Sequence, residues 1–126
     1  RDLKLVENRI TAIGDWAGVS DHMDLPLRTF SSGMVARLAF AVATDQTADV
    51  LLIDEVLSVG DIEFQTKSAE RMQKLISGGA AVVLVSHDLA AVRRLATKAI
   101  WIDAGRVMKY GEVREVTSEY ESSFQN

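Results

Sequence analysis

The chain has no cysteine and only one proline among its 126 residues. Without thiols it can form neither a disulfide framework nor a thiolate metal site, and a reducing compartment is compatible with it. Its longest apolar runs, Leu38 to Ala43 and Ala80 to Val85, are far shorter than the ~20 residues of a membrane-spanning helix. We therefore expect no direct membrane insertion, so that any role at a membrane would depend on a partner.

The chain also lacks a concentration of charge of one sign. Its formal net charge is −4 and its basic residues are scattered, so we expect no nucleic-acid partner. With 48% hydrophobic and 25% charged residues, the composition is typical of one globular domain or a part of one. Arg1 opens directly into a helical pattern, and we expect the natural polypeptide to continue before it.

Helical patterns alternate with strand patterns along the chain. Helices are predicted over 3–13, with Gly14 as the stop, over 19–23, over 34–44 as a well-buried helix with a serine cap, over 64–76 before Gly78 and Gly79, over 89–96, and from 112 to the end. The lone Pro26 is expected to end regular structure. Strands are predicted over 50–53 and 81–85, both buried on two faces, and a hairpin over 100–103 and 106–110 that turns at Gly105 with positive φ. This order predicts an α/β fold with a mainly parallel sheet.

Polar residues follow both predicted parallel strands, at the ends where α/β sheets place ligands. Asp54 and Glu55 close the first strand, and because side chains alternate along a strand they cannot both point the same way. One could face a metal and the other a nucleophile, or both could simply cap the following turn. His87 follows the second strand, where it could equally be a helix-capping or hydrogen-bonded structural residue.

A third candidate site is the segment of small polar residues before the helix over 34–44. Ser31, Ser32 and Gly33 expose backbone N–H groups at the positive end of a helix dipole, which favours an anion such as a phosphate. An ordinary N-cap has the same appearance. The three weak signals strengthen one another because they occur in one chain, in a fixed order.

That order resembles the ATPase subunit of ABC transporters. The segment FSSGMVARLAFA (30–41) looks like the ABC signature, LLIDE (51–55) like Walker B, SVGD (58–61) like the D-loop, and VSHD (85–88) like the switch loop. The Ser-Ser-Gly-Met form is similar to the branch that exports polysaccharides, O-antigen or teichoic acid. The resemblance implies the carboxyl-terminal part of a P-loop NTPase domain. Residues 1–47 would belong to the helical subdomain, 48–111 to the RecA-like core with a β-hairpin, and 112–126 to a terminal helix.

The resemblance also implies roles for individual residues in an intact enzyme with ATP and Mg²⁺ as cofactors. Asp54 would hold Mg²⁺ through water, Glu55 would act as general base on the attacking water, and His87 would reach the γ-phosphate. Asp61 would follow the dimer interface, or be an exposed turn residue. The signature residues would serve the nucleotide of the other subunit, namely Ser31, Ser32, Gly33 and Met34.

The family's partners are a second ATPase subunit, giving a homodimer, and a transmembrane permease. The resemblance implies a peripheral position at the cytoplasmic face of the inner membrane and a part in exporting a polysaccharide or lipid-linked glycan. Two alternatives remain open: a soluble ABC-type ATPase without a permease, and a non-catalytic interaction fragment.

Departures from the family pattern limit what this chain can do alone. No Gly-Lys pair occurs, so the P-loop that holds the β- and γ-phosphates is absent, and no glutamine in residues 1–30 can form a Q-loop. We therefore expect no ATP turnover by the isolated chain. Without a P-loop strand beside the Walker B strand, we expect apolar area to be exposed on Leu51, Ile53, Val83 or Val85.

Overall fold

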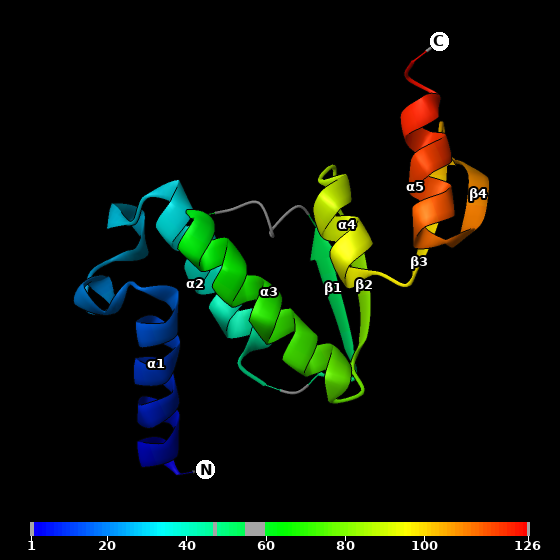
Figure 1. Cartoon of the computed structure of the whole chain (residues 1–126). Coiled ribbons are helices and arrows are strands. Elements are labelled where there is room, and N and C mark those ends of the chain that lie inside the picture. The colour runs from blue at the N-terminus through cyan, green and yellow to red at the C-terminus, as the bar shows by residue number, and fades with distance from the viewer. Residues whose placement is uncertain (1, 47, 55–59, 126) are drawn as a thin grey trace. The chain divides into compact units, whose positions relative to one another are not determined.

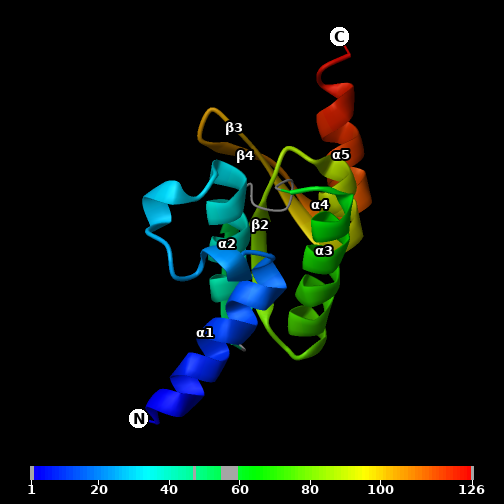
Figure 2. The same cartoon turned by 90° about the vertical axis from the view of Figure 1, so that its left-hand side faces the viewer.

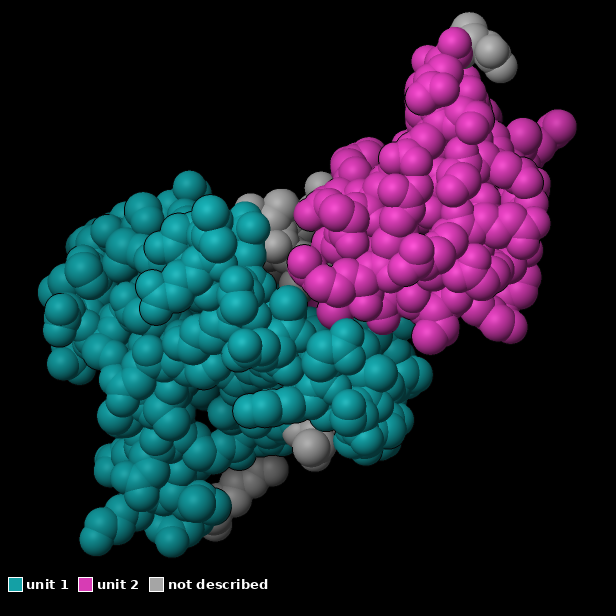
Figure 3. Space-filling model, in the orientation of Figure 1, with its two compact units in different colours: residues 1–51, 56–83 teal, residues 52–55, 84–126 magenta. Residues whose placement is uncertain are grey.

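The computed structural model describes residues 2–46, 48–54 and 60–125, and it has an α/β fold. The chain divides into two compact units (Figure 3), one of residues 1–51 and 56–83 and the other of residues 52–55 and 84–126. Figure 1 labels the elements, which are α1 (Leu3–Ala17), α2 (Ser32–Thr44), β1 (Val50–Asp54), α3 (Ile62–Ser77), β2 (Ala81–Val85), α4 (Leu89–Leu95), β3 (Lys98–Asp103), β4 (Arg106–Glu112) and α5 (Val113–Ser122). Two single turns of 3-10 helix, Ser20–His22 and Leu27–Thr29, lie between α1 and α2.

The first helix continues past the glycine that we expected to stop it. Gly14 lies buried inside α1, and the helix ends instead at Gly18, whose φ of 70° is left-handed. A Cβ on Gly14 would lie 2.8 Å from Cγ of Met23, so this glycine allows the segment after the helix to pack closely. The prediction that Gly14 stops the helix was therefore wrong, because its role depends on a residue that returns from beyond the helix.

The structure of the segment between α1 and α2 agrees only in part with the structure predicted from the sequence. The predicted short helix over 19–23 is one 3-10 turn, Ser20–His22. Pro26 does not end regular structure, because the turn Leu27–Thr29 begins directly after it. The chain thus reaches Ser31 through short turns.

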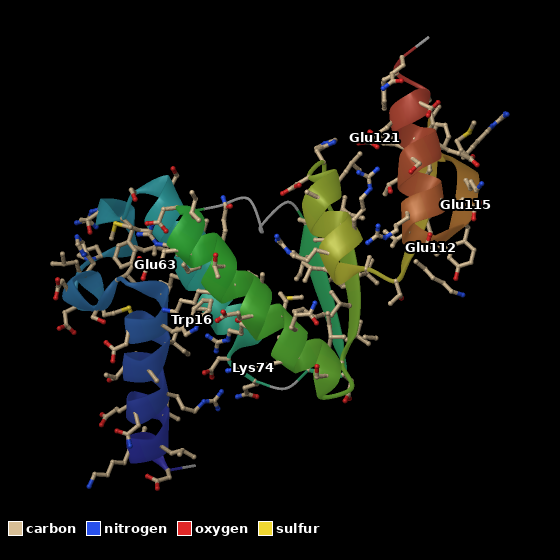
Figure 4. The ribbon with its side chains drawn as sticks, in the orientation of Figure 1. Trp16, Glu63, Lys74, Glu112, Glu115 and Glu121 are labelled. Carbon is tan, nitrogen blue, oxygen red and sulfur yellow. The ribbon has the colours of Figure 1, made fainter. Side chains whose placement is uncertain are left out.

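Three aromatic rings join the helices of the first unit. Trp16 of α1 stacks on Phe40 of α2 with ring centroids 5.8 Å apart, and Phe64 of α3 meets Trp16 edge-on at 5.4 Å. The Trp16 side chain extends from α1 towards α3 (Figure 4). Nζ of Lys67 lies 4.7 Å and Cζ of Arg71 lies 4.2 Å from the centroid of its ring, and both residues belong to α3. Trp16 of α1 is therefore in contact with residues of both α2 and α3.

The serine-capped helix α2 forms as predicted, but only one side of it is buried. Ala41 is fully buried, together with Phe40 and Thr44, and belongs to a core cluster with Ala17 and Val19. On the other side, Val42 is 57% exposed. The prediction of a well-buried helix was wrong, because a run of alanine and leucine shows apolar composition and not how many sides have packing partners.

Strands β1 and β2 pair as a two-stranded sheet and start together, since the Ala81 N–H donates to the Asp49 carbonyl at 2.9 Å. The predicted burial on both faces is wrong. Along β1, Leu51 and Ile53 are buried, whereas Val50 and Leu52 are exposed. Along β2, exposed residues, Val83 and Val85 among them, alternate with half-buried ones. The expected exposure is thus confirmed for Val83 and Val85, and it is wrong for Leu51 and Ile53.

The remaining helices and strands are close to their predicted bounds, and the second unit ends in a hairpin against a helix. β3 and β4 pair antiparallel about Ala104 and Gly105, and the predicted positive φ of Gly105 is confirmed at 75°. α5 packs on both strands, so the hairpin and helix lie side by side in both views (Figures 1 and 2). Trp101 of β3 meets Tyr120 of α5 edge-on, with ring centroids 5.8 Å apart.

Candidate functional site

The signature segment forms the start of α2. Ser31 has extended backbone, its hydroxyl accepts from the Met34 N–H at 3.2 Å, and its carbonyl accepts from the Val35 N–H at 3.0 Å. Ser31 and Ser32 are exposed, and a Cβ on Gly33 would have nothing closer than 3.9 Å. Ser31 is thus an ordinary N-cap, and the start of the helix is exposed and open around Gly33.

The two strands that carry candidate residues end at the same edge of their sheet. β1 and β2 are five residues long and start together, so Asp54 at the end of β1 lies beside the end of β2. Asp54 is exposed, and Glu55 lies outside the described residues. The prediction that these two carboxylates point in opposite directions therefore stays a prediction.

His87 lies between β2 and α4 and is exposed. The cap of α4 is Asp88, whose carboxylate accepts from the N–H groups of Ala90 and Ala91 at 3.0 and 3.1 Å. The Asp88 N–H in turn donates to the Ser86 hydroxyl at 3.0 Å. The capping role that His87 could have had thus belongs to its neighbour, and the backbone on both sides of His87 is held by short-range hydrogen bonds.

Asp61 caps α3. Its carboxylate accepts from the Phe64 N–H at 2.9 Å, and its carbonyl accepts from the Gln65 N–H at 3.0 Å. Gly60 before it has a positive φ of 95°, whereas Ser58 and Val59 of the D-loop lie outside the described residues. Asp61 therefore has a local structural role as the cap of α3, and its predicted place at a dimer interface stays a prediction.

The candidate residues fall into two groups. Asp54 and His87 belong to the unit of residues 52–55 and 84–126, whereas the four signature residues and Asp61 belong to the other unit. Within residues 2–46, 48–54 and 60–125, no group of three or more His, Asp or Glu side chains could hold a metal ion. In those same residues, no helix has the length and apolar character to cross a membrane.

Sequence reasoning missed two ionic clusters that shape the units. In the unit of residues 1–51 and 56–83, Arg71 Nε donates to the Thr44 carbonyl at 3.2 Å. Burial lowers the pKa of Arg71, and the negative charge of Asp45 nearby acts in the opposite direction. In the second unit, Arg93 Nε donates to the Thr117 hydroxyl at 2.8 Å and its guanidinium also pairs with Glu121. The two partners of Arg93 lie 24 and 28 residues away along the chain. Contacts over such separations leave no local pattern in the sequence.

Comparisons with known proteins agree on one family. The chain is 45% identical over 115 residues to the O-antigen export system ATP-binding protein RfbB of Myxococcus xanthus, covering 91% of this chain and 26% of that protein. It is 37% identical over 116 residues to the teichoic acids export ATP-binding protein TagH of Bacillus anthracis, covering 92% and 21%. The O-antigen export system ATP-binding protein RfbB of Klebsiella pneumoniae is 33% identical over 120 residues, covering 95% of this chain and 49% of that protein. The chain thus spans between a fifth and a half of these relatives.

Solved structures show the same fold. The ATP-binding subunit of an ABC transporter matches 95% of this chain and 50% of its own with a TM-score of 0.80 and 21% identity. A dimeric ATP-binding cassette in a post-hydrolysis state with ADP and phosphate matches 90% and 50%, with a TM-score of 0.75 and 20% identity. A scan against models of protein families found no match. By sequence the chain is a homologue of the O-antigen and teichoic acid export ATP-binding proteins, and its fold is that of an ABC ATPase domain over the part that it spans.

Proposed function

We propose that the chain supplies the signature, Walker B, D-loop and switch-histidine residues of an ABC-type ATPase that powers export of a polysaccharide or lipid-linked glycan. The observation that carries this proposal is the placement of Asp54 at the end of β1 and of His87 just after β2, the strand paired with it. The 45% identity to an O-antigen export protein supports the substrate class. In such an enzyme, residues 1–47 would lie in the helical subdomain, 48–111 in the core and 112–126 in a terminal helix.

The chemistry divides between metal binding, proton transfer and phosphate contact. Asp54 is one exposed carboxylate at a strand end, which fits Mg²⁺, an ion that keeps several waters and takes few protein ligands. When bound, Mg²⁺ supplies positive charge to the phosphate oxygens of ATP. Glu55 accepts a proton from the attacking water, and His87 contacts the γ-phosphate and orients that water.

The start of α2 would contribute to a second nucleotide. Ser31, with its hydroxyl, and Gly33, with its backbone N–H, can meet a phosphate at the positive end of a 13-residue helix. Ser32 and Met34 complete this segment. Such an arrangement requires a second ATPase subunit, with Asp61 near the interface. A permease would be the membrane partner, as the likeness to export ATP-binding proteins suggests. The ATPase would then act peripherally at the cytoplasmic face of the inner membrane.

The 126 residues of this chain do not include a phosphate-binding P-loop. The chain contains no Gly-Lys pair, so the P-loop must come from another stretch of polypeptide. A soluble ABC-type ATPase without a permease is the alternative. One similar fold, at 21% identity and a TM-score of 0.72, is an archaeal ribosome recycling factor in complex with a ribosomal stalk protein.

Export by a chimera tests the proposal. The matched segment of the Myxococcus xanthus protein is replaced by this chain, and the chimera is returned to cells that lack their own copy. We expect O-antigen to reach the cell surface, and the same chimera with Glu55→Gln to leave it inside. If the chimera is produced in normal amounts and assembles with its permease but exports no O-antigen, the proposed substrate class is wrong.

A further inference from the structure

The helix α4 begins two residues after His87. Asp88, the residue after His87, is the N-cap of α4, and the helix has only seven residues. His87 is thus joined to α4 through the residue that caps the helix. At ~1.5 Å of rise per residue, Arg93 near the other end lies roughly 8 Å from Asp88 along the helix axis. A contact at Arg93 can therefore set the angle of the whole helix and the place of His87.

Arg93 ties α4 to the terminal helix α5. Its Nε donates to the Thr117 hydroxyl at 2.8 Å, and its Nη2 forms an ion pair with Glu121 one turn further along α5. Thr117 is only 3% exposed, and its hydroxyl also bonds to the Val113 carbonyl at 2.7 Å. The guanidinium thus engages two successive turns of α5, one buried and one at the surface.

α5 is in turn fixed to the β3–β4 hairpin. Lys109 of β4 pairs with Glu115 at 2.7 Å and with Glu119, which raises the pKa of Lys109. Glu115 lies on the side of α5 away from Glu121 (Figure 4). The helix is therefore held on one side by the hairpin and on the other by Arg93 of α4.

We propose that Arg93 is a positioning residue that links α5 to His87. It acts through the geometry of α4 and has no contact with nucleotide of its own. An effect of this link on ATP turnover rests on the proposed role of His87. A shift of the hairpin or of α5 would then move α4 through Arg93, and with it His87 and its contact to the γ-phosphate. The link itself is a property of the second unit and needs no nucleotide.

NMR of the two histidine side chains tests the link. The chain contains only His22 and His87, so the two imidazole Cε1–H signals can be assigned with one substitution each. His22 belongs to the other unit, where it meets the Phe30 ring, and it serves as an internal control. At fixed pH and without ATP, Arg93→Gln should move the His87 signal by more than its linewidth and leave His22 in place.

Two further variants separate positioning from a general loss of structure or charge. Arg93→Lys keeps the ion pair with Glu121 but loses the Nε hydrogen bond to Thr117, so it should restore the His87 signal in part. Arg94→Gln changes the same charge on an exposed neighbour and should not move it. If Arg93→Gln fails to fold, Glu121→Gln gives the same readout. An unmoved His87 signal, or an equal shift with Arg94→Gln, would overturn the proposal whether or not the parent enzyme hydrolyses ATP.

Discussion

At the scale of single residues, Asp61 has two possible roles that one pair of substitutions can separate. Its carboxylate caps α3 by accepting from the Phe64 N–H at 2.9 Å. Asp61→Ala should lower the free energy of unfolding by about 1 kcal/mol, whereas Asp61→Asn, which still caps, should cost a few tenths at most. Urea unfolding of the chain measures both. If Asp61→Asn abolishes activity in the chimera yet is stable, Asp61 has a role beyond the cap.

Ala104 gives a second residue-scale prediction. It is the one described non-glycine residue with positive φ, 46°, at the first position of the two-residue turn between β3 and β4. A left-handed backbone costs an alanine ~1 kcal/mol that a glycine does not lose. Ala104→Gly should therefore stabilise the hairpin by up to about 1 kcal/mol, measured by thermal unfolding. Ala104→Val is the opposite control, because a β-branched side chain should lower the melting temperature.

Local sequence patterns predicted the structural roles of some residues but not of residues whose partners lie far along the chain. Ser31 as a cap and Gly105 with positive φ follow from neighbours within three residues. Gly14 and Gly18 could not be told apart, because the decisive fact is the approach of Met23 to Gly14. Arg93 was missed for the same reason, since its partners lie on another helix.

At the scale of elements, β1 shows what apolar runs can and cannot predict. The run predicted the strand to within one residue. It could not predict which side is covered, because all four of its residues are apolar and coverage depends on the packing partners. The alternation of exposed and buried residues is thus a fact of tertiary structure.

Neighbouring leucines of β1 give a matched pair of variants. Leu51 is 8% exposed and Leu52 is 74% exposed. Leu51→Ala should lower the free energy of unfolding by about 2–5 kcal/mol, because it leaves a cavity. In the monomer, Leu52→Ala should change it by less than about 0.5 kcal/mol. Equal losses in chemical denaturation would show that both faces of β1 are covered in solution.

At the scale of the whole molecule, exposed apolar side chains gather on the strands. Val50, Leu52, Val83 and Val85 are each more than half exposed. We expect the chain to associate with itself at micromolar concentrations, because large apolar patches are rarely left open to water. Light scattering should show a mass above 13.8 kDa. Leu52→Lys with Val83→Lys should return it towards the monomer, and a sharply monodisperse wild-type monomer would contradict the expectation.

The candidate site was predictable in outline because its motifs occur in order along the chain. The sequence placed Asp54 and His87 at strand ends, and the paired strands confirm this placement. The role of Glu55 stays a prediction because this residue lies outside the described residues. In the proposed function the signature residues would meet a nucleotide only with a second subunit present, and contacts between two chains leave no pattern within one sequence.

The most direct test of the proposed ATPase role is phosphate release by the chimera with the Myxococcus xanthus protein. We predict ATP turnover by the chimera and no measurable turnover by the 126-residue chain alone. Glu55→Gln should lower turnover by about 10²-fold or more, because it removes the general base while leaving nucleotide binding intact. A folded chimera that binds ATP and releases phosphate no faster than its Glu55→Gln form would contradict the catalytic role proposed for this chain.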